Sequence, residues 1–171
     1  MTRDLIEVVN IKPKTAEQSK VSIGNLMHLE QANMNGNVHG GEIMKFMDNA
    51  AGIVAGRHAR ANVVTARVES LEFHCPIHIG NLVTCLGQLS FVGNSSMEVF
   101  IKVLVEDLTK EESPKIASTA LFTMVAVDKN GQPLSVPPLE ITNEEERKLF
   151  EEGKKRYLAY KQKRSKGKEL T

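Results

Sequence analysis

The sequence predicts an α+β domain in which one long helix precedes a run of antiparallel strands. Apolar residues recur at helical spacing between Gly41 and Gly56, and from Val63 onward they alternate with polar residues. The first pattern indicates a helix with one buried face, and the second indicates strands. A helix followed by long strands joined by short turns is what a sheet wrapped around a central helix requires. The 171 residues, 41% of them hydrophobic, suffice for one domain with a sizeable core.

Composition excludes several classes of protein. The formal net charge of +1 gives no general attraction to nucleic acid. No apolar run approaches the roughly 18 residues of a membrane span, and the charged start of the chain does not resemble a secretory signal. A cytoplasmic protein without a membrane span or a nucleic-acid partner is therefore expected. Cys75 and Cys85 fall in strand-like segments and are interpreted as small buried residues, not as a disulfide or metal pair.

The first third of the chain leads into the helix. Residues 1–17 are predicted to be a loosely ordered lead-in, and a first strand is predicted within residues 18–30, where Gly24 weakens the pattern. The helix then begins near Gly41 and is predicted to end near Gly56. Its apolar face consists of Ile43, Met47, Ala50 and Val54.

The strands that follow are predicted from alternation. In the first of them Val64, Ala66 and Val68 alternate with polar residues, and the apolar parity then changes near Ser70. Such a change within one run predicts a β-bulge. Later strands are predicted over residues 82–92, 97–106 and 116–127, with a turn at 93–96 and a charged connection at 107–114.

A second helix is predicted at the C-terminal end, starting from a capping box of Thr142 and Glu145. Eight Lys or Arg and one Glu follow Gly153. Such a basic tail is usually solvated and frayed, although it could also help to hold phosphates. The chain thus divides into the lead-in at 1–17, the main domain at 18–140, and a C-terminal helix with a basic tail at 141–171.

A polar, glycine-rich loop over residues 33–41 runs directly into the first helix. Its glycines allow tight turns and close approach of a ligand. The amides of Gly40 and Gly41 are predicted to be unpaired donors at the positive end of the helix dipole, where they can stabilise a developing oxyanion. Asp48 points away from the apolar face, toward Gly41 and Gly52, where a substrate can reach it. Taken alone, these features also fit a solvated Asp and ordinary helix capping.

The order of Asn35, the His39-Gly40-Gly41 triplet and Asp48 resembles the hot-dog-fold acyl-CoA thioesterases. The similar branch contains the small bacterial acyl-CoA hydrolases and the brain-type acyl-CoA hydrolase with two tandem copies. The resemblance spans roughly residues 15–130 and continues through residues 52–58, 63–68, Phe73 and 93–99. It implies a hot-dog fold, in which an antiparallel sheet wraps around the central helix.

The resemblance also implies an activity, the hydrolysis of a fatty acyl-CoA to CoA and a carboxylic acid, with no cofactor or metal. On the matching positions, the Gly41 amide would polarise the carbonyl, Asp48 would act as base or nucleophile, and Asn35 would orient the water. His39, next to Gly40, is expected to fix the loop by bonding to a backbone carbonyl. Because one site in this branch takes its Asn loop and its Asp helix from different domains, a single-copy chain is expected to form at least a homodimer, and trimers of dimers occur in the branch.

The phosphates of CoA need positive charge and hydrogen-bond donors, and two stretches compete to supply them. The first surrounds the end of the helix and the next strand, and the second is the turn at 93–96, which on its own could simply close a hairpin. The basic tail after Gly153 is the weaker candidate. The predicted CoA-binding residues are Arg57, His58, Arg60, Val64, Thr65, Arg67, Asn94, Ser95 and Ser96.

Two other functions stay open. The same fold hosts acyl-CoA hydratases and dehydratases, for which His39 is available, although the nearest helical acid, Asp48, lies nine residues further on. A non-catalytic acyl-CoA-binding module is the other alternative, but it would need neither Asn35 nor Asp48. The sequence does not specify the length of the acyl chain.

Overall fold

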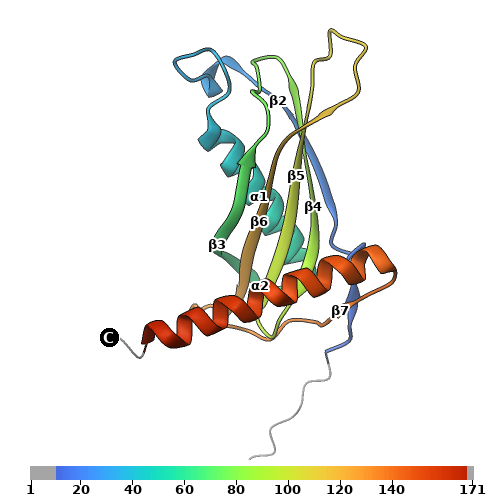
Figure 1. Cartoon of the computed structure of the whole chain (residues 1–171), viewed down its shortest axis with the longest axis vertical. Coiled ribbons are helices and arrows are strands. Elements are labelled where there is room, and N and C mark those ends of the chain that lie inside the picture. Colours follow the sequence, from blue (N-terminus) through green and yellow to red (C-terminus); the bar gives the residue numbers. More distant parts are fainter. Residues whose placement is uncertain (1–10, 169–171) are drawn as a thin grey trace, which may run out of the picture.

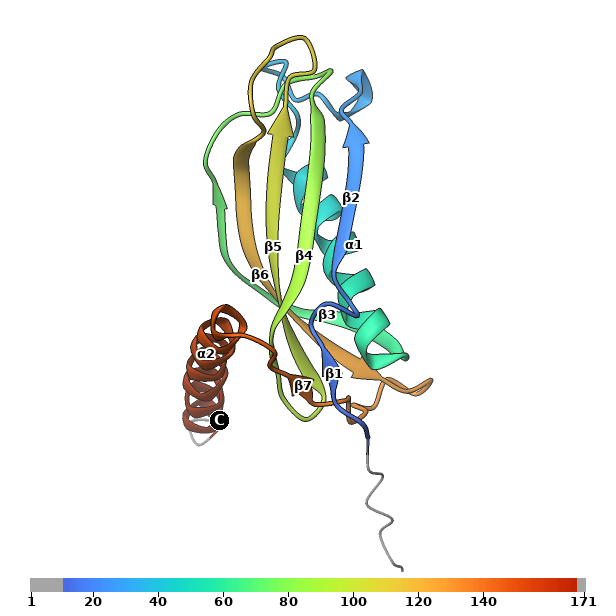
Figure 2. The ribbon, with the colours of Figure 1, turned by 90° about the vertical axis from the view of Figure 1, so that its right-hand side faces the viewer.

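The structure, a computed structural model, describes residues 11–168, and side chains as far as residue 165. Its main feature is a five-stranded antiparallel sheet with strand order β2-β4-β5-β6-β3. Two helices cover it from opposite faces, α1 (Gly40–Ala59) along its length and α2 (Glu144–Lys168) across one end (Figures 1 and 2). The predicted hot-dog architecture with an added C-terminal helix is confirmed. The strands are β2 Val21–Leu26, β3 Asn62–Phe73, β4 Leu82–Val92, β5 Ser96–Glu106 and β6 Lys115–Val127.

The predicted apolar face of α1 forms the centre of the core. Ile43, Met47, Ala50 and Val54 are all buried, together with Ala51 and Ala55. These alanines leave room for the helix to lie close to the sheet. At the facing position of β4, a Cβ on Gly87 would lie only 3.0 Å from the side chains of Val54 and Ile101, so a larger residue there would push the helix away.

The predicted end of α1 near Gly56 is wrong by one turn. The helix continues to Ala59, and Arg60 adopts the left-handed conformation (φ 53°) that terminates it. Its backbone N–H donates to the carbonyl of Gly56 at 2.9 Å, which satisfies one of the last helical acceptors. The capping conformation therefore falls on an arginine, and the preceding glycine stays helical.

Strand β3 lies at the edge of the sheet and contains two irregularities. The one predicted near Ser70 is confirmed, because the register shifts between Glu69 and Glu72 and Ser70 has a φ of 50°. A second shift between Thr65 and Arg67 makes Ala66 an extra residue, so Val64 and Val68 face opposite sides of the sheet. The predicted single apolar face of Val64, Ala66 and Val68 is therefore wrong.

The three central strands follow the predicted alternation closely. β4 has the predicted bounds, and β5 and β6 each begin one residue earlier than predicted. In β5 the inward residues are buried against α1, because odd-numbered positions share one face of a regular strand. These buried residues are Met97, Val99, Ile101, Val103 and Val105.

Helix α2 starts from a different cap than predicted. Asn143 is the capping residue, since its Oδ1 accepts from the N–H of Glu146 at 2.9 Å. The carboxylate of Glu146, not of Glu145, then accepts from the N–H and the hydroxyl of Thr142, each at 2.9 Å. The predicted capping box of Thr142 and Glu145 is therefore wrong, because Asn143 supplies the cap and Glu146 bonds back to Thr142.

The expectation of a frayed basic tail is also wrong for the described residues, because α2 runs unbroken to Lys168. Arg156 anchors it by two hydrogen bonds, of 2.9 and 2.8 Å, to the carboxylate of Glu98, which is only 6% exposed. Ser90 donates to the same carboxylate at 2.5 Å. The rings of Phe150 and Tyr157 pack on Phe91, with centroids 5.1 and 5.2 Å away.

The N-terminal segment is tied to the domain at its end. Lys14–Thr15 (β1) pairs in parallel with Leu139–Glu140 (β7), and Ala16 is buried. The predicted lead-in at 1–17 is thus anchored over its last residues, while residues 1–10 lie outside the described part of the chain. The first strand, β2, occupies only Val21–Leu26 of the predicted range.

Both cysteines are free, and burial raises the pKa of the Cys85 thiol to about 12. Among residues 11–168 no helix is long and apolar enough to cross a membrane.

The close packing of α2 on the sheet predicts that two glycine substitutions, one in each helix, change stability in opposite directions. A Cβ on Gly153 would lie 2.5 Å from Phe91 Cβ and 2.8 Å from the Glu98 carboxylate, so Gly153→Ala should lower the free energy of unfolding by about 1–3 kcal/mol. A Cβ on Gly56 in α1 meets no atom within 4 Å, so Gly56→Ala should raise it by about 0.5–1 kcal/mol through helix propensity. Urea unfolding measures the free energy of unfolding of both variants. Equal effects of the two substitutions would contradict the close contact of Gly153 with Phe91 and Glu98.

Candidate active site

Asp48 lies on the flank of α1, beside the edge strand β3. The hydroxyl of Thr65 donates to its Oδ1 at 2.5 Å. The carboxylate opens into a cleft of about 840 Å³ that is largely apolar. The apolar lining consists of Ile23, Phe46, Ile53, Ala61, Val63 and Met124. A carboxylate oriented by a hydroxyl on the wall of an apolar cleft is suited to act on an apolar substrate that carries one polar reacting group.

The polar loop before α1 is organised by Asn33. Its side-chain Oδ1 accepts from the amides of Asn35 and Asn37 at 2.9 and 3.2 Å, and Gly36 provides the positive φ of 76° that the turn needs. Asn35 is exposed at the tip of the loop. Asn33 instead lines a second pocket, of about 390 Å³, together with Gly40 and other residues at the end of β3.

His39 caps α1 with its side chain. Its Nδ1 accepts from the N–H of Gly41 at 3.1 Å, and its own N–H donates to the carbonyl of Gln31 at 2.8 Å. The expected bond from the His39 ring to a backbone carbonyl is therefore wrong. The Gly41 amide is occupied, whereas the Gly40 amide has no hydrogen-bond partner among the described residues. An oxyanion bound at Gly41 would have to share that amide with the exposed ring of His39.

Within one chain the loop and Asp48 are not brought together. Asp48 lies eight residues after Gly40, which is roughly 12 Å along the axis at 1.5 Å per residue. Neither Asn33 nor Asn35 lines the cleft beside Asp48. Asp48 therefore lines one pocket and Asn33 and Gly40 line another, while the predicted residues Asn35 and Gly41 line neither of the two.

The predicted CoA-binding residues at the end of α1 do not form one site. His58 is fully buried, its Nε2 lies 2.7 Å from the carbonyl of Pro137, and burial lowers the pKa of its imidazole. It cannot face a phosphate in this structure, so this assignment is wrong. Arg57 donates to the carbonyl of Lys20 at 2.7 Å, and Arg60 is the helix cap. Val64 is 48% exposed on the far side of β3 from α1.

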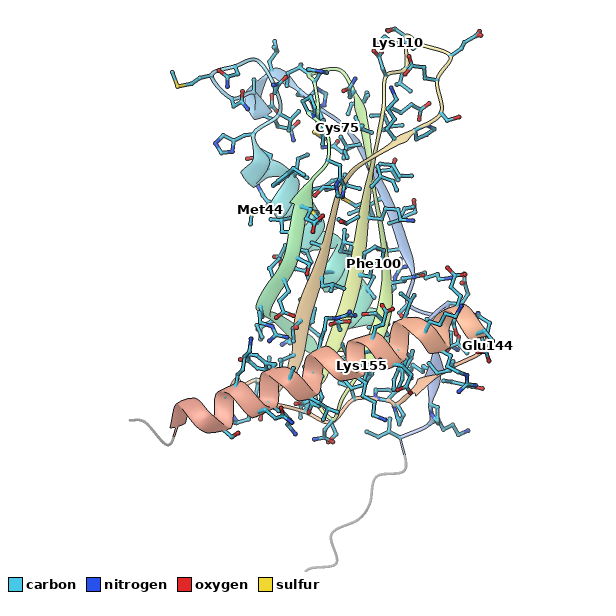
Figure 3. All side chains as sticks on the ribbon, in the orientation of Figure 1. Met44, Cys75, Phe100, Lys110, Glu144 and Lys155 are labelled. Atoms are coloured by element: carbon cyan, nitrogen blue, oxygen red, sulfur yellow. The ribbon has the colours of Figure 1, made fainter. Side chains whose placement is uncertain are left out.

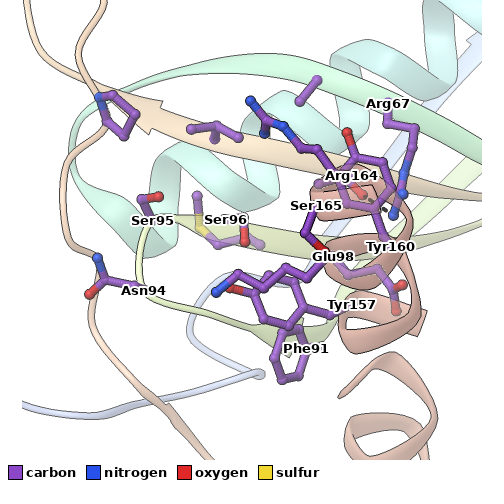
Figure 4. A pocket seen from close by; sticks show the side chains of 16 residues that line it. Arg67, Phe91, Asn94, Ser95, Ser96, Glu98, Tyr157, Tyr160, Arg164 and Ser165 are labelled. Carbon is purple, nitrogen blue, oxygen red and sulfur yellow. Dashed lines mark hydrogen bonds between the residues drawn. The ribbon is translucent and has the colours of Figure 1, made fainter. Parts of the chain in front are cut away.

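Of the remaining predicted residues, Thr65 lines the Asp48 cleft, whereas Arg67, Asn94, Ser95 and Ser96 meet in a cleft of about 580 Å³ between the sheet and α2 (Figure 4). Arg67 and the turn at 94–96 form its sheet side. Its helix side lies in the segment that was predicted to be the weaker phosphate candidate, because the basic tail was interpreted as solvated. The helix side consists of Tyr157, Tyr160, Lys161, Arg164 and Ser165. Their spacing of three or four residues on one helix face is the signal that could have revealed them.

Comparison with known proteins shows to which family the chain belongs. The sequence model of the Thioesterase superfamily matches residues 35–112. The Bacillus subtilis protein YkhA, described as an uncharacterized acyl-CoA thioester hydrolase, is 38% identical over 130 residues, which cover 76% of this chain and 74% of YkhA. This chain belongs to the thioesterase superfamily. The cytosolic acyl coenzyme A thioester hydrolase of Rattus norvegicus is 40% identical over 163 residues, 94% of this chain but only 43% of the rat protein. The chain thus spans less than half the length of that relative.

Solved structures of thioesterases share its fold. The acyl-CoA hydrolase of Staphylococcus aureus, solved with butyryl coenzyme A and coenzyme A, superposes with a TM-score of 0.81 at 29% identity over 92% of this chain and 95% of its own. An apo hexameric acyl-CoA thioesterase superposes with a TM-score of 0.83 at 30% identity over 90% of this chain and 97% of its own. Alanine variants of the S. aureus enzyme, at an Asn, an Asp and a Thr, have also been solved. Those three positions have the same sequence spacing as Asn33, Asp48 and Thr65 in this chain.

Because His39 caps α1, the effect of replacing it on stability should depend on whether the new side chain can accept a hydrogen bond. His39→Ala should lower the free energy of unfolding by about 0.5–2 kcal/mol, because the Gly41 amide loses its acceptor. His39→Asn should keep most of the stability, since Asn is a preferred capping residue. Thermal or urea unfolding compares the two variants. Equal stability of His39→Ala and the wild type would show that the cap does not stabilise α1.

Proposed function

We propose that this thioesterase hydrolyses fatty acyl-CoA to CoA and a carboxylic acid, and that it needs no cofactor beyond the substrate. The observation that supports this most strongly is the placement of Asp48. Its Oδ1 accepts from the Thr65 hydroxyl at 2.5 Å, and it lies on the wall of an apolar cleft. Membership of the superfamily and the names of the bacterial and rat relatives support the substrate class. The rat relative's description as cytosolic supports a cytoplasmic location.

In the proposed reaction the acyl chain lies along the apolar residues of the Asp48 cleft. Asp48 removes a proton from water, which adds to the thioester carbonyl, or it attacks the carbonyl itself to form a mixed anhydride that water then hydrolyses. In both cases the C–S bond breaks and CoA leaves as its thiol after taking up a proton. The Gly40 amide, at the positive end of α1, stabilises the negative charge that develops on the carbonyl oxygen, and the Gly41 amide contributes by sharing its hydrogen bond with the His39 ring.

Asn33 is a better candidate than Asn35 for the residue that orients the water. The substituted Asn of the S. aureus hydrolase precedes its substituted Asp by the same interval that separates Asn33 from Asp48. Asn33 also lines a pocket next to Gly40, whereas Asn35 is exposed at the loop tip. Because the Asn33 Oδ1 already accepts from two loop amides, its NH₂ group is the part free to bind a ligand.

The complete site is proposed to form between two copies of the chain. Large apolar side chains are exposed along α1 and the neighbouring edge strand, among them Met44 (41%, labelled in Figure 3), Val68 (37%) and Phe73 (51%). Such a patch is typical of an interface. A two-fold dimer through this face would bring the Asn33 loop of one copy toward the Asp48 cleft of the other, and it would create two equivalent sites. The hexameric relative supports further assembly into a trimer of dimers.

The first test of the proposal is the release of CoA from acyl-CoA. Asp48→Asn should lower kcat by about 10²–10⁴-fold, because a general base or nucleophile is lost in a nearly isosteric change. Glu106→Gln, which removes a carboxylate at the far end of β5, serves as the control and should keep wild-type activity. Thiol release is followed over a panel of acyl chain lengths. An Asp48→Asn enzyme with unchanged kcat would contradict the assignment, and wild-type binding without release would favour the non-catalytic alternative.

A second test concerns the shared site. Asn33→Ala and Asp48→Ala subunits should each be inactive, yet their equimolar mixture should recover about a quarter of wild-type activity after subunit exchange. Half of the dimers are then mixed, and each mixed dimer has one site with both wild-type residues. A mixture that stays inactive although mass spectrometry detects mixed dimers would place both residues of a site in one chain. Repeating the exchange with Asn35→Ala decides between the two asparagines.

A further inference from the structure

Gly52 lies in the middle of α1, where glycine is unfavourable because it loses more backbone freedom than any other residue. A glycine inside a helix usually has a packing or functional reason. Apart from the backbone of its own helix, no described atom lies within 4 Å of a Cβ built on Gly52, so packing within the chain does not require a glycine. Gly56 is equally open, but only Gly52 lines the Asp48 cleft. The missing side chain therefore leaves its space to the cleft.

The Asp48 cleft extends across the solvent-facing side of α1. At about 100° per residue, the residues of α1 that line it follow one another around the helix in the order Asp48, Gly52, Asn49, Ile53 and Phe46. Asp48 lies on the flank next to β3. Ile53 and Phe46 lie on the opposite flank, toward the other edge strand, β2, whose Ile23 also lines the cleft. Gly52 is thus the point at which the cleft passes over the helix.

Beyond Gly52 the cleft presents apolar side chains. This distal part consists of Ile53, Phe46 and Ile23, of which Ile53 is 37% exposed. Apolar surface open to solvent beside a reacting carboxylate fits a ligand with a polar reacting group and a long apolar tail. Because a helix with its side chains is about 10 Å across, a tail with about 1.5 Å per C–C bond needs roughly eight to ten carbons to reach the distal part.

We infer that Gly52 sets the acyl-chain preference of this thioesterase, and that the preferred substrates carry medium and long chains. Acyl groups of roughly eight carbons or more cross α1 at Gly52, and their ends lie on Ile53, Phe46 and Ile23. Shorter acyl groups end beside Asp48 and gain nothing from the distal part. The inference rests on the proposed hydrolysis of acyl-CoA, and it adds the chain length that the sequence does not specify.

The test measures kcat/KM for dodecanoyl-CoA and for butyryl-CoA. Gly52→Leu should lower the ratio of the two values at least about tenfold, because the new side chain fills the passage and each CH₂ kept out of the distal part loses about fourfold in binding. The matched control is Gly56→Leu, which makes the same change one turn later in α1, outside the cleft. The control should keep the wild-type ratio.

Four results would overturn the inference. They are a wild-type ratio in Gly52→Leu, an equal loss with both substrates, the same shift in the control, and loss of the wild-type oligomer by light scattering, which would give the space at Gly52 to a partner helix. If Gly52→Leu does not fold, Gly52→Val replaces it, with Gly56→Val as its control, and the same results decide.

Direct binding separates this inference from the proposed hydrolysis. The probes are S-dodecyl-CoA and S-butyl-CoA, two thioethers that cannot be hydrolysed and that differ only in the length of the chain. By calorimetry, the wild type should bind the dodecyl compound at least about tenfold more tightly, and Gly52→Leu should lose this preference. If the wild type releases no CoA yet shows the preference, the hydrolysis fails and the role of Gly52 stands. If the wild type hydrolyses acyl-CoA but Gly52→Leu keeps the preference, the hydrolysis stands and the role of Gly52 is refuted.

Discussion

The close packing of α1 against the sheet determines where Asp48 lies relative to the edge strand β3. Ala50, Ala51 and Ala55 have no exposed surface, and the facing position in β4 is Gly87, where a methyl group would already be within 3.0 Å of its neighbours. Small residues on both sides let the helix backbone come near the strands. At this depth a residue on the flank of the helix is within hydrogen-bonding distance of the edge strand, and for this reason Asp48 meets Thr65. A bulkier residue on either side would move the carboxylate away from its hydroxyl partner, because a packed interior has no spare volume.

The sequence predicts the central strands almost to the residue and the edges of elements less well, for a physical reason. β4 and β5 are paired on both sides and bury one face under α1, so their apolar residues must alternate. β3 is an edge strand with a partner on one side only, and its Val64 and Val68 are 48% and 37% exposed. Because these side chains are only partly buried, burial does not fix which residues of β3 face α1. The sequence of β3 is therefore compatible with a bulge at Ala66 as well as with regular alternation. Helix ends depend on equally local choices, as when Asn143 takes the cap that Thr142 could also supply.

The sequence singles out Asp48, but it does not predict the residues that surround the candidate site. Asp48 stands out because it is an acid next to glycines at helical spacing. The burial of His58 could not be predicted, since a His between basic residues at a helix end looks like surface, and only the fold places Pro137 against it. The cleft under α2 was missed for a related reason. Its anchor is Glu98, a polar residue on a strand face that carries no apolar pattern, and its ion pair with Arg156 joins residues far apart in the chain.

A single inserted residue in β3 explains how one strand can serve both clefts. In a regular strand, residues two positions apart face the same side, so Thr65 and Arg67 would both point at α1. Because Ala66 is extra, Thr65 donates to Asp48 on α1, while Arg67 stacks on Tyr160 of α2 on the opposite face. Without the bulge, Arg67 would point into the cleft beside Asp48, where its guanidinium could pair with that carboxylate, and the cleft under α2 would lose its sheet-side cation. The bulge thus places Thr65, the partner of Asp48, and Arg67 of the cleft under α2 on opposite faces of the sheet, although they are only two residues apart in the chain.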